Sequence, residues 1–429
     1  MQIFTLFGIF ALLLLIGVPI GTSVGFAAVF SIWKYGLGVT MISRNFASGI
    51  AKFPLIAIPF FVLAGILMQK AKLAEKISNL ATILVGRATG GLAIAGVLTC
   101  LFWGAVSGSG PATTAAVGLT IIPVMIYQKY DKNFSAATIA AASGLAIIIP
   151  PSIAFIIYGN VTGVSVGALF LGGIIPGIII GLFLMVAAYF VSKKRDFRGI
   201  KKRGTVKEIL ITTKDAFWAL LAPVIILGGI YAGIATPTEA AVFAVFYSIF
   251  VGIFIYKTLT LKGLYEALVG TVITSAVVMF VVTFATQFSI ASAVLGVIDI
   301  MAESIIAIAK TPIAVLLLAN LAIIIAGMFL DAISIIYVFM PIFIPILNYY
   351  HIDLLFFGII FVVALAIGQI TPPVAVNLYV AANLINSSLD KVAKEVWIFV
   401  VAAILGLIFL TFFPQISQYV PVASGLYIP

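Results

Sequence analysis

The chain has 429 residues, of which 64% are hydrophobic and 8% charged, and its mean hydropathy is +1.31, which excludes an ordinary soluble domain and is typical of a polytopic membrane protein. One cysteine, Cys100, and one histidine, His351, exclude a disulfide framework and a cysteine-based metal site and leave little acid–base chemistry for an enzyme. The net charge of +10 is compatible with a nucleic-acid partner, but eight basic residues gather between Lys193 and Lys207. In a membrane protein such a cluster indicates a cytoplasmic loop, so no nucleic-acid partner is expected.

Apolar runs long enough for a hydrocarbon layer of ~30 Å predict an all-α polytopic membrane protein with about ten transmembrane spans and two re-entrant helical hairpins. The first run, from Phe4 to Ile16, lacks the basic start of a signal peptide and continues into more apolar sequence, so we expect it to be a retained span. The spans are expected at 3–18, 20–33, 54–69, 134–163, 166–191, 216–233, 238–256, 267–298, 354–386 and 393–412, and the hairpins at 90–127 and 312–348.

The segment from Gly104 to Pro123 places small, polar and helix-breaking residues where an ordinary span is most apolar. Backbone groups freed by Gly and Pro find no water in hydrocarbon, so such a segment survives only where protein or a polar cavity surrounds it. A helical hairpin with its tip at Ser107 to Pro111 would present free N–H groups to an anion, and carbonyls and hydroxyls to a small hard cation. A simple kink with a Gly104–Gly108 helix-packing pair is an equally good interpretation of this segment alone.

Two double prolines, Pro150-Pro151 and Pro372-Pro373, interrupt the expected spans 134–163 and 354–386. Each pair removes two backbone donors and disfavours helix at the preceding residue, so each creates another half-helix start near the middle of the membrane. Interruptions at matching places in two halves of a chain indicate the binding site of a secondary transporter.

The two halves of the chain form an internal repeat with an offset of 222 residues. The offset relates Pro123 to Pro345 and one double proline to the other, and it sets Ser109 opposite Asp331. Each half contains an odd number of expected spans, so the second half must enter the membrane from the opposite side. An inverted repeat is therefore predicted.

Two acidic residues, Glu239 and Asp331, lie in apolar surroundings, where a charge is expensive and usually functional. Glu239 follows Thr236-Pro237-Thr238 in the pattern of a helix capping box, so a structural role is favoured. Asp331 is expected at the tip of the second hairpin. There it could cap the returning helix, face an aqueous pathway or take part in a cation site.

Three motifs carry a family resemblance: Gly104-Ala-Val-Ser-Gly-Ser-Gly-Pro-Ala-Thr-Thr, Ala235-Thr-Pro-Thr-Glu-Ala-Ala and Gln369-Ile-Thr-Pro-Pro-Val-Ala-Val-Asn. Together they resemble the large membrane subunit of tripartite ATP-independent periplasmic (TRAP) transporters, and the resemblance runs the whole length of the chain. It implies a multi-pass protein of the bacterial inner membrane that takes up an organic acid, a sialic acid or a C4-dicarboxylate, by symport with sodium ions. Overall likeness leans towards sialic acid.

The resemblance also implies an elevator movement within the membrane lipid, in which the hairpins and broken spans ride against a scaffold. Two partners are implied, a separate small four-span membrane subunit and a periplasmic solute-binding protein. Scaffold segments are expected at 1–89, at 164–298 with the basic loop, and at 391–429. Transport segments, each with one hairpin and one broken span, are expected at 90–163 and 299–390.

Site residues follow from the resemblance where the motifs match. The residues implied for sodium binding are Ser107, Ser109, Gly144, Ile147, Pro150, Asp331, Gly368, Thr371 and Pro372. The substrate is expected between the two hairpin tips, and the residues implied for it are Gly108, Thr113, Ser152, Ser334 and Asn377. No catalytic residue and no metal other than sodium is expected.

Other functions fit the sequence less well. An intramembrane enzyme is disfavoured because Gly-x-Ser-x-Gly, His-Glu-x-x-His and a P-loop are absent from the sequence. A channel would need a continuous polar pore lining, whereas two separate inverted sites suit alternating access. A stand-alone sodium-coupled carboxylate transporter of the same build, working without a binding protein, is the alternative.

Overall fold

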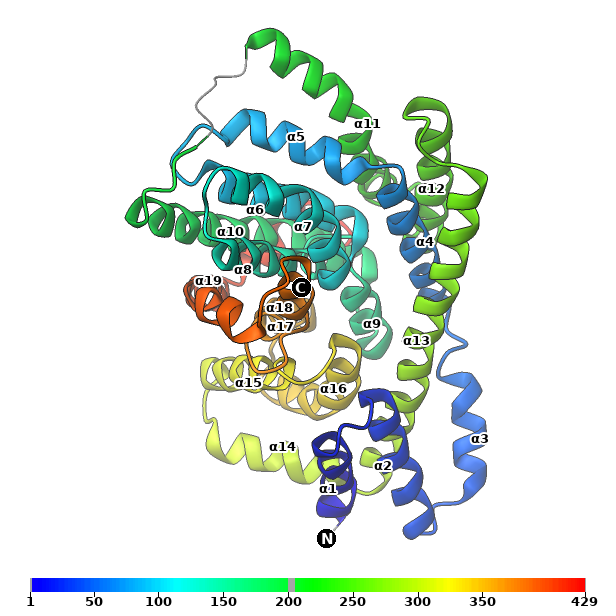
Figure 1. The fold of residues 1–429 in the computed structure, drawn as a ribbon. Helices are drawn as coiled ribbons and strands as arrows, with labels where there is room; N and C mark the ends of the chain where they lie inside the picture. The colour runs from blue at the N-terminus through cyan, green and yellow to red at the C-terminus, as the bar shows by residue number, and fades with distance from the viewer. Residues whose placement is uncertain (1, 200–204, 429) are drawn as a thin grey trace.

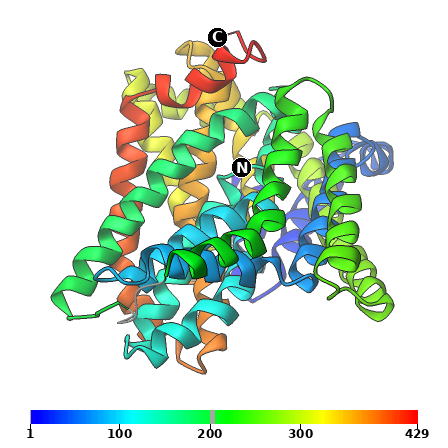
Figure 2. The ribbon, with the colours of Figure 1, turned by 90° about the horizontal axis from the view of Figure 1, so that it is seen from above.

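The computed structural model describes residues 2–199 and 205–428, and the regular secondary structure of these residues is entirely helical (Figure 1, Figure 2). Eight of the described helices are long and apolar enough to cross a membrane. The predicted all-α fold is therefore confirmed. Residues 200–204, which belong to the expected basic loop, lie outside the described residues.

The first half of the chain runs from α1 to α10. Its elements are α1 (Gln2–Leu15), α2 (Ile20–Lys34), α3 (Val39–Ser48), η1 (Phe53–Ile56), α4 (Ala57–Lys70), α5 (Leu73–Val85), α6 (Gly91–Ser107), α7 (Gly110–Tyr127), α8 (Lys132–Ser143), η2 (Gly144–Ile147), α9 (Ile153–Thr162) and α10 (Val166–Lys194). Here α6 and α7 form the first hairpin, and α8, η2 and α9 form the first broken span.

The second half runs from α11 to α20. Its elements are α11 (Val206–Tyr231), α12 (Pro237–Phe250), η3 (Val251–Ile255), α13 (Leu261–Val294), α14 (Val297–Ile308), α15 (Pro312–Gly327), α16 (Ala332–Tyr349), α17 (Leu354–Gly368), α18 (Val376–Leu384), α19 (Leu389–Phe412) and α20 (Gln415–Ala423). The second hairpin consists of α15 and α16, and the second broken span of α17 and α18.

Helix boundaries follow the offset that the prolines predict. Gly110 begins α7 and Ala332 begins α16, while Lys132 begins α8 and Leu354 begins α17, so each pair is 222 residues apart. The returning hairpin helices α7 and α16 both have 18 residues. The two halves therefore repeat the order of hairpin and broken span. The two halves differ in one interval. In the first half it is divided among α3, η1 and α4, whereas in the second half α13 is one continuous helix.

Several short helices were not predicted from the sequence. The amphipathic helix α5 buries Leu73, Ile77 and Leu80 at helical spacing and packs against α6 and α11. The expected span 267–298 was too long at its end, because α13 stops at Val294 and α14 starts after Gly296. Gly296 has a positive φ of 67°, a conformation that glycine adopts without strain and that breaks the helix within an otherwise apolar run.

The helices fall into two groups that meet around a central cavity. In one group α13 packs against α2 and α4, and α4 packs against α12; these helices lie on the right of Figure 1. In the other group the two hairpins and the two broken spans pack on each other and on α10 and α19. The groups touch where α4 meets α6 and where α13 meets α16.

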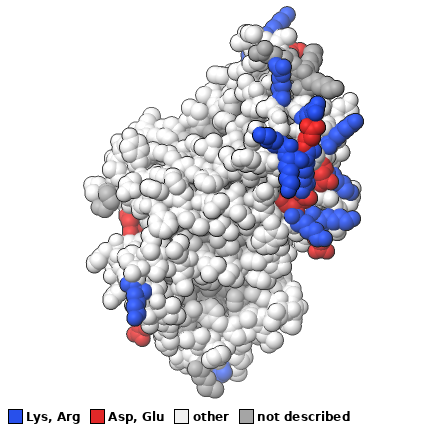
Figure 3. Space-filling model, turned by 90° about the vertical axis from the view of Figure 1, so that its left-hand side faces the viewer, with Lys and Arg blue, Asp and Glu red and all other residues white. Residues whose placement is uncertain are grey.

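Basic residues gather at one end of the second group, on the face shown in Figure 3. Lys193 and Lys194 lie in the last turn of α10, and the following Arg195 forms a salt bridge of 2.8 Å with Glu395 of α19. The Arg195 guanidinium also lies over the ring of Phe134 on α8, 5.6 Å from its centroid. The start of the predicted cytoplasmic loop is thus tied to α8 and α19.

Candidate functional site

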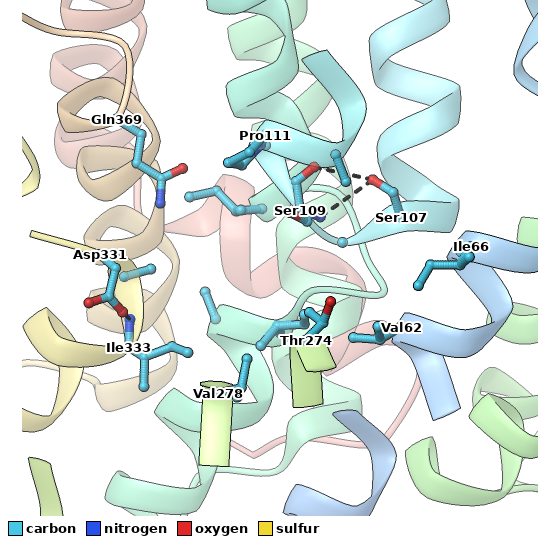
Figure 4. A pocket seen from close by; sticks show the side chains of 18 of the residues that line it. Val62, Ile66, Ser107, Ser109, Pro111, Thr274, Val278, Asp331, Ile333 and Gln369 are labelled. Atoms are coloured by element: carbon cyan, nitrogen blue, oxygen red, sulfur yellow. Dashed lines mark hydrogen bonds between the residues drawn. The ribbon is translucent and has the colours of Figure 1, made fainter. Parts of the chain in front are cut away.

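A cavity of about 260 Å³ lies between the tips of the two hairpins (Figure 4). The first hairpin contributes Ser107 to Ala112, and the second contributes Asp331 to Ile333. In Figure 4 Asp331 and the Ser107–Ser109 tip lie on opposite sides of the cavity. The remaining wall consists of Val62, Gly65, Ile66, Gln69, Trp103, Ile147, Ile153, Ala154, Thr274, Val278 and Gln369.

The tip of the first hairpin leaves a helix start open to this cavity. Gly108, with a φ of +60°, ends α6 and donates its N–H to the carbonyl of Gly104, and α7 begins two residues later with Ser109 as its N-cap residue. The Ser109 side chain makes no capping hydrogen bond. Since Pro111 has no N–H and the N–H of Thr113 donates to the Ser109 carbonyl, α7 leaves the N–H groups of Gly110 and Ala112 for a ligand.

Close backbone contacts hold this tip against the first broken span. A Cβ added to Gly104 would lie 2.7 Å from Cα of Ala146, and one added to Gly108 would lie 2.7 Å from the Pro151 carbonyl oxygen. Any other residue at either position would force the neighbouring backbone to shift. These contacts bring the Ser107–Ser109 tip next to the segment from Gly144 to Pro151, whose helix is interrupted.

The hydroxyls of Ser107 at the first tip and of Ser152 in the first broken span already have protein partners. Ser107 Oγ lies 2.6 Å from Thr113 Oγ1 and also donates to the Ser109 carbonyl at 3.3 Å. Ser152 Oγ donates to the Ile147 carbonyl at 2.5 Å and accepts the N–H of Phe155, so it caps α9. These bonds fix the tip, and a bound cation would have to share the Ser107 oxygen.

The second tip is capped by a carboxylate. Asp331 Oδ2 accepts the N–H groups of Ile333 at 3.0 Å and Ser334 at 3.2 Å, and Oδ1 accepts the Ser334 hydroxyl at 2.6 Å. The capping role considered for Asp331 is therefore present, and the same residue lines the cavity.

The second hairpin also rests on its broken span. A Cβ added to Gly327 would lie 2.9 Å from Cα of Gly368, and the N–H of Val374 donates to the Met328 carbonyl at 3.3 Å. Thr371 directs its hydroxyl to the Ile367 carbonyl at 2.6 Å. The structure thus brings the second hairpin next to the segment from Gly368 to Pro372.

The predicted site residues divide into those that line the cavity and those that do not. Ser107, Gly108, Ser109, Ile147 and Asp331 line it. Residues that do not line it are Thr113, Gly144, Pro150, Ser152, Ser334, Gly368, Thr371, Pro372 and Asn377. Of these, Asn377 is fully buried against Gly110, and neither polar atom of its side chain has a hydrogen-bond partner among the described residues. Their roles in sodium or substrate binding stay predictions.

Sequence reasoning missed several lining residues. Gln369 lies within a quoted motif, and its position beside the double proline is the signal that could have identified it. Trp103, Gln69 and Thr274 carry no such signal, because they come from helices whose faces only the packing of α4, α6 and α13 reveals.

The chemistry of the cavity suits a small anion together with a hard cation. Its described lining contains one carboxylate, that of Asp331, and no Lys, Arg or His. No group of three or more His, Cys, Asp and Glu residues in the described parts of the chain could hold a metal ion. Open N–H groups at one tip and oxygens at the other are the groups that half-helices use in secondary transporters.

Residues 7–416 match the family model described as the tripartite ATP-independent periplasmic transporter, DctM component. This chain belongs to that family. It is therefore a multi-pass protein of the inner membrane and a transporter component, not an enzyme, as the motifs predicted.

Known TRAP permeases are similar to this chain over almost its whole length. The isethionate permease DctMQ of Oleidesulfovibrio alaskensis is 40% identical, and the match covers 96% of this chain but 65% of that protein. The sialic acid large permease SiaM of Vibrio cholerae is 36% identical, with 95% of this chain and 96% of that protein covered. The C4-dicarboxylate large permease DctM of Rhodobacter capsulatus is 33% identical, with 99% and 100% covered.

Solved structures share the fold. The YdaH transporter of Alcanivorax borkumensis superposes with a TM-score of 0.65 at 16% identity, covering 89% of this chain and 88% of that one. MtrF of Neisseria gonorrhoeae superposes with a TM-score of 0.59 at 12% identity, covering 87% and 83%. At these identities the likeness concerns the fold alone.

Proposed function

We propose that this chain is the large membrane subunit of a TRAP transporter that takes up an organic acid across the inner membrane, driven by an inward sodium gradient. The observation that supports this most is the pairing of two unlike hairpin tips around one cavity. The open start of α7 suits an anion, and the Asp331 tip suits a cation. If the site is occupied only when the anion and the cation are both bound, the transport of one requires the transport of the other.

Sodium is proposed to bind where each hairpin crosses its broken span. At the first crossing the oxygens available are Ser107 Oγ and the carbonyls of the segment from Gly144 to Pro151. At the second they are those of Asp331 and of the segment from Gly368 to Pro372. Carboxylate, carbonyl and hydroxyl oxygens are the ligands that hard cations prefer.

An elevator movement is supported by the distribution of polar groups around the cavity. The hairpins and broken spans carry the open N–H groups of α7, the Asp331 carboxylate and the Gln369 amide. The lining that α4 and α13 contribute to the same cavity is uncharged and mostly apolar. It consists of Val62, Gly65, Ile66 and Val278 together with two polar residues, Gln69 and Thr274. In this proposal the polar site travels with the hairpins along that lining.

The proposed substrate is an organic acid, and the related permeases are named for isethionate, sialic acid and C4-dicarboxylates. The proposed partners are a small four-span membrane subunit and a periplasmic solute-binding protein. These partners would capture solute from dilute surroundings. The described helices of this chain form no separate soluble domain that could do so.

Uptake into proteoliposomes tests the proposal. The chain reconstituted with its small subunit and loaded binding protein is expected to accumulate substrate under an inward sodium gradient, and the chain alone is expected to be nearly inactive. Equal uptake in potassium with only a proton gradient would contradict sodium coupling. Full activity of the chain alone would favour the stand-alone carrier.

A further inference from the structure

We infer that the cavity selects organic anions with a single negative charge and discriminates against dianions, and that Asp331 sets this selectivity. The inference rests on the proposed function, because it names the substrate class of the same cavity. It comes from the unequal use of the three helix starts that surround the cavity, those of α7, α9 and α16.

One of these helix starts is open to a ligand. The start of α7 has no side-chain cap, and its free N–H groups, on Gly110 and Ala112, belong to residues that line the cavity. They supply about half a positive charge and a few hydrogen bonds, enough to hold one carboxylate or sulfonate.

The other two helix starts are already occupied by the protein itself. Ser152 caps α9 through the N–H of Phe155. Asp331 caps α16 through the N–H groups of Ile333 and Ser334, and its negative charge offsets the positive end of that helix. Neither start can receive a second anionic group without displacing a cap.

Among the described residues, the cavity wall contains no positive charge that could stabilise a second anionic group on the substrate. The described lining residues include no basic side chain, and the one charged residue among them, Asp331, is itself negative. Taking a second charge out of water without a partner is costly, and the Asp331 carboxylate adds repulsion.

A neutral polar group on the substrate does have a partner available. Gln369 lines the cavity, is 9% exposed, and its Oε1 has no hydrogen-bond partner among the described residues. Figure 4 shows its side chain directed into the space between Asp331 and Pro111. A hydroxyl on the substrate could donate to this oxygen or to Asp331. The cavity therefore fits a hydroxylated monoanion.

Direct binding to the purified complex of this chain with its small membrane subunit tests the inference. Calorimetry would compare pairs of similar size that differ in charge: 2-hydroxyethanesulfonate with sulfoacetate, and lactate with malate, with N-acetylneuraminate as a larger monoanion. Saturating sodium is the stringent condition, because a sodium ion beside Asp331 would weaken its repulsion of a dianion.

Wild-type protein is expected to bind at least one monoanion about tenfold or more tightly than its dianionic counterpart. In Asp331→Asn this ratio should fall towards one, because the amide no longer repels a second negative charge. The amide oxygen can still accept the capping N–H groups, so the tip should keep its fold. Glu239→Gln, which changes a carboxylate that does not line the cavity, should leave the ratio unchanged. Melting temperature without ligand checks that each variant is folded.

Wild-type protein that binds dianions as tightly as monoanions would overturn the inference, even if the Asp331 variant did not fold, and would leave sodium-driven uptake intact. An unchanged ratio in a folded Asp331→Asn variant would overturn the role of Asp331. Failure to bind any of the probes, together with absent sodium-driven uptake, would overturn the proposed function as well.

Discussion

The two hairpin tips each present a helix start to the cavity, but they differ in electrostatic character. Both present the start of an 18-residue returning helix to one cavity, and the N-cap residue is Ser109 in one and Asp331 in the other. Ser109 leaves its helix start open, whereas Asp331 closes its own with a carboxylate. In the proposed function, this one difference at a repeated position makes the first tip suit an anion and the second tip suit a cation.

Making the first tip like the second should have the largest effect. Ser109→Asp would cap α7 and place a carboxylate beside the proposed anion site. A like charge ~4 Å away costs about 4 kcal/mol at an effective dielectric constant of ~20, so we expect substrate binding to fall by about a hundredfold or more. Calorimetry measures this. Ser109→Asn, which caps without charge, is the control, and an equal loss there would assign the effect to capping.

Removing the charge of the second tip should have the second largest effect. Asp331→Asn keeps a capping oxygen but loses the proposed cation ligand, so we expect sodium-driven uptake to fall by about tenfold or more, equivalent to about 1.4 kcal/mol. Uptake by proteoliposomes at normal membrane expression is the measurement. Normal transport in this variant would mean that the second cation site lies elsewhere.

A smaller effect is expected from the hydroxyls of the first tip. The double variant Ser107→Ala with Ser109→Ala removes proposed ligands while small side chains still fit the tip. The sodium concentration for half-maximal uptake should rise by about threefold to tenfold, since the two lost ligands are together worth about 1 kcal/mol. An unchanged sodium dependence would move the first site away from this tip.

The smallest effect is expected at Glu239. Its carboxylate accepts the N–H of Thr236 at 2.8 Å, and Thr236 Oγ1 accepts the N–H of Glu239 at 3.3 Å, so the predicted capping box is present. Glu239→Gln should therefore cost about 1 kcal/mol or less of stability and leave uptake within about twofold of wild type. Loss of uptake in Glu239→Gln together with normal uptake in Asp331→Asn would show that the structural and functional acids were assigned the wrong way round.

Much of the fold could be predicted from the sequence because its signals are local. Gly108 and Pro111 mark the first tip, the double prolines mark the broken spans, and Thr236 with Glu239 marks the start of α12. Such residues act through their own backbone geometry and hydrogen-bonding groups, so their positions in the chain suffice.

The short amphipathic helices and the end of α13 were beyond this reasoning. Hydrophobicity continues from α13 into α14, and a single glycine, Gly296, makes the turn between them. The buried face of α5 becomes recognisable only when α6 and α11 are packed against it.

By itself the sequence determined the membrane class, the repeat, both hairpins, both broken spans and the family. Only the tertiary structure decided which groups face the cavity. Gln369 lines it, whereas Ser152, Ser334 and Asn377 do not, and α4 and α13 complete it from far along the chain. The physical reason is that helix starts and breaks are encoded locally, while the direction of a side chain depends on the packing of helices distant in sequence.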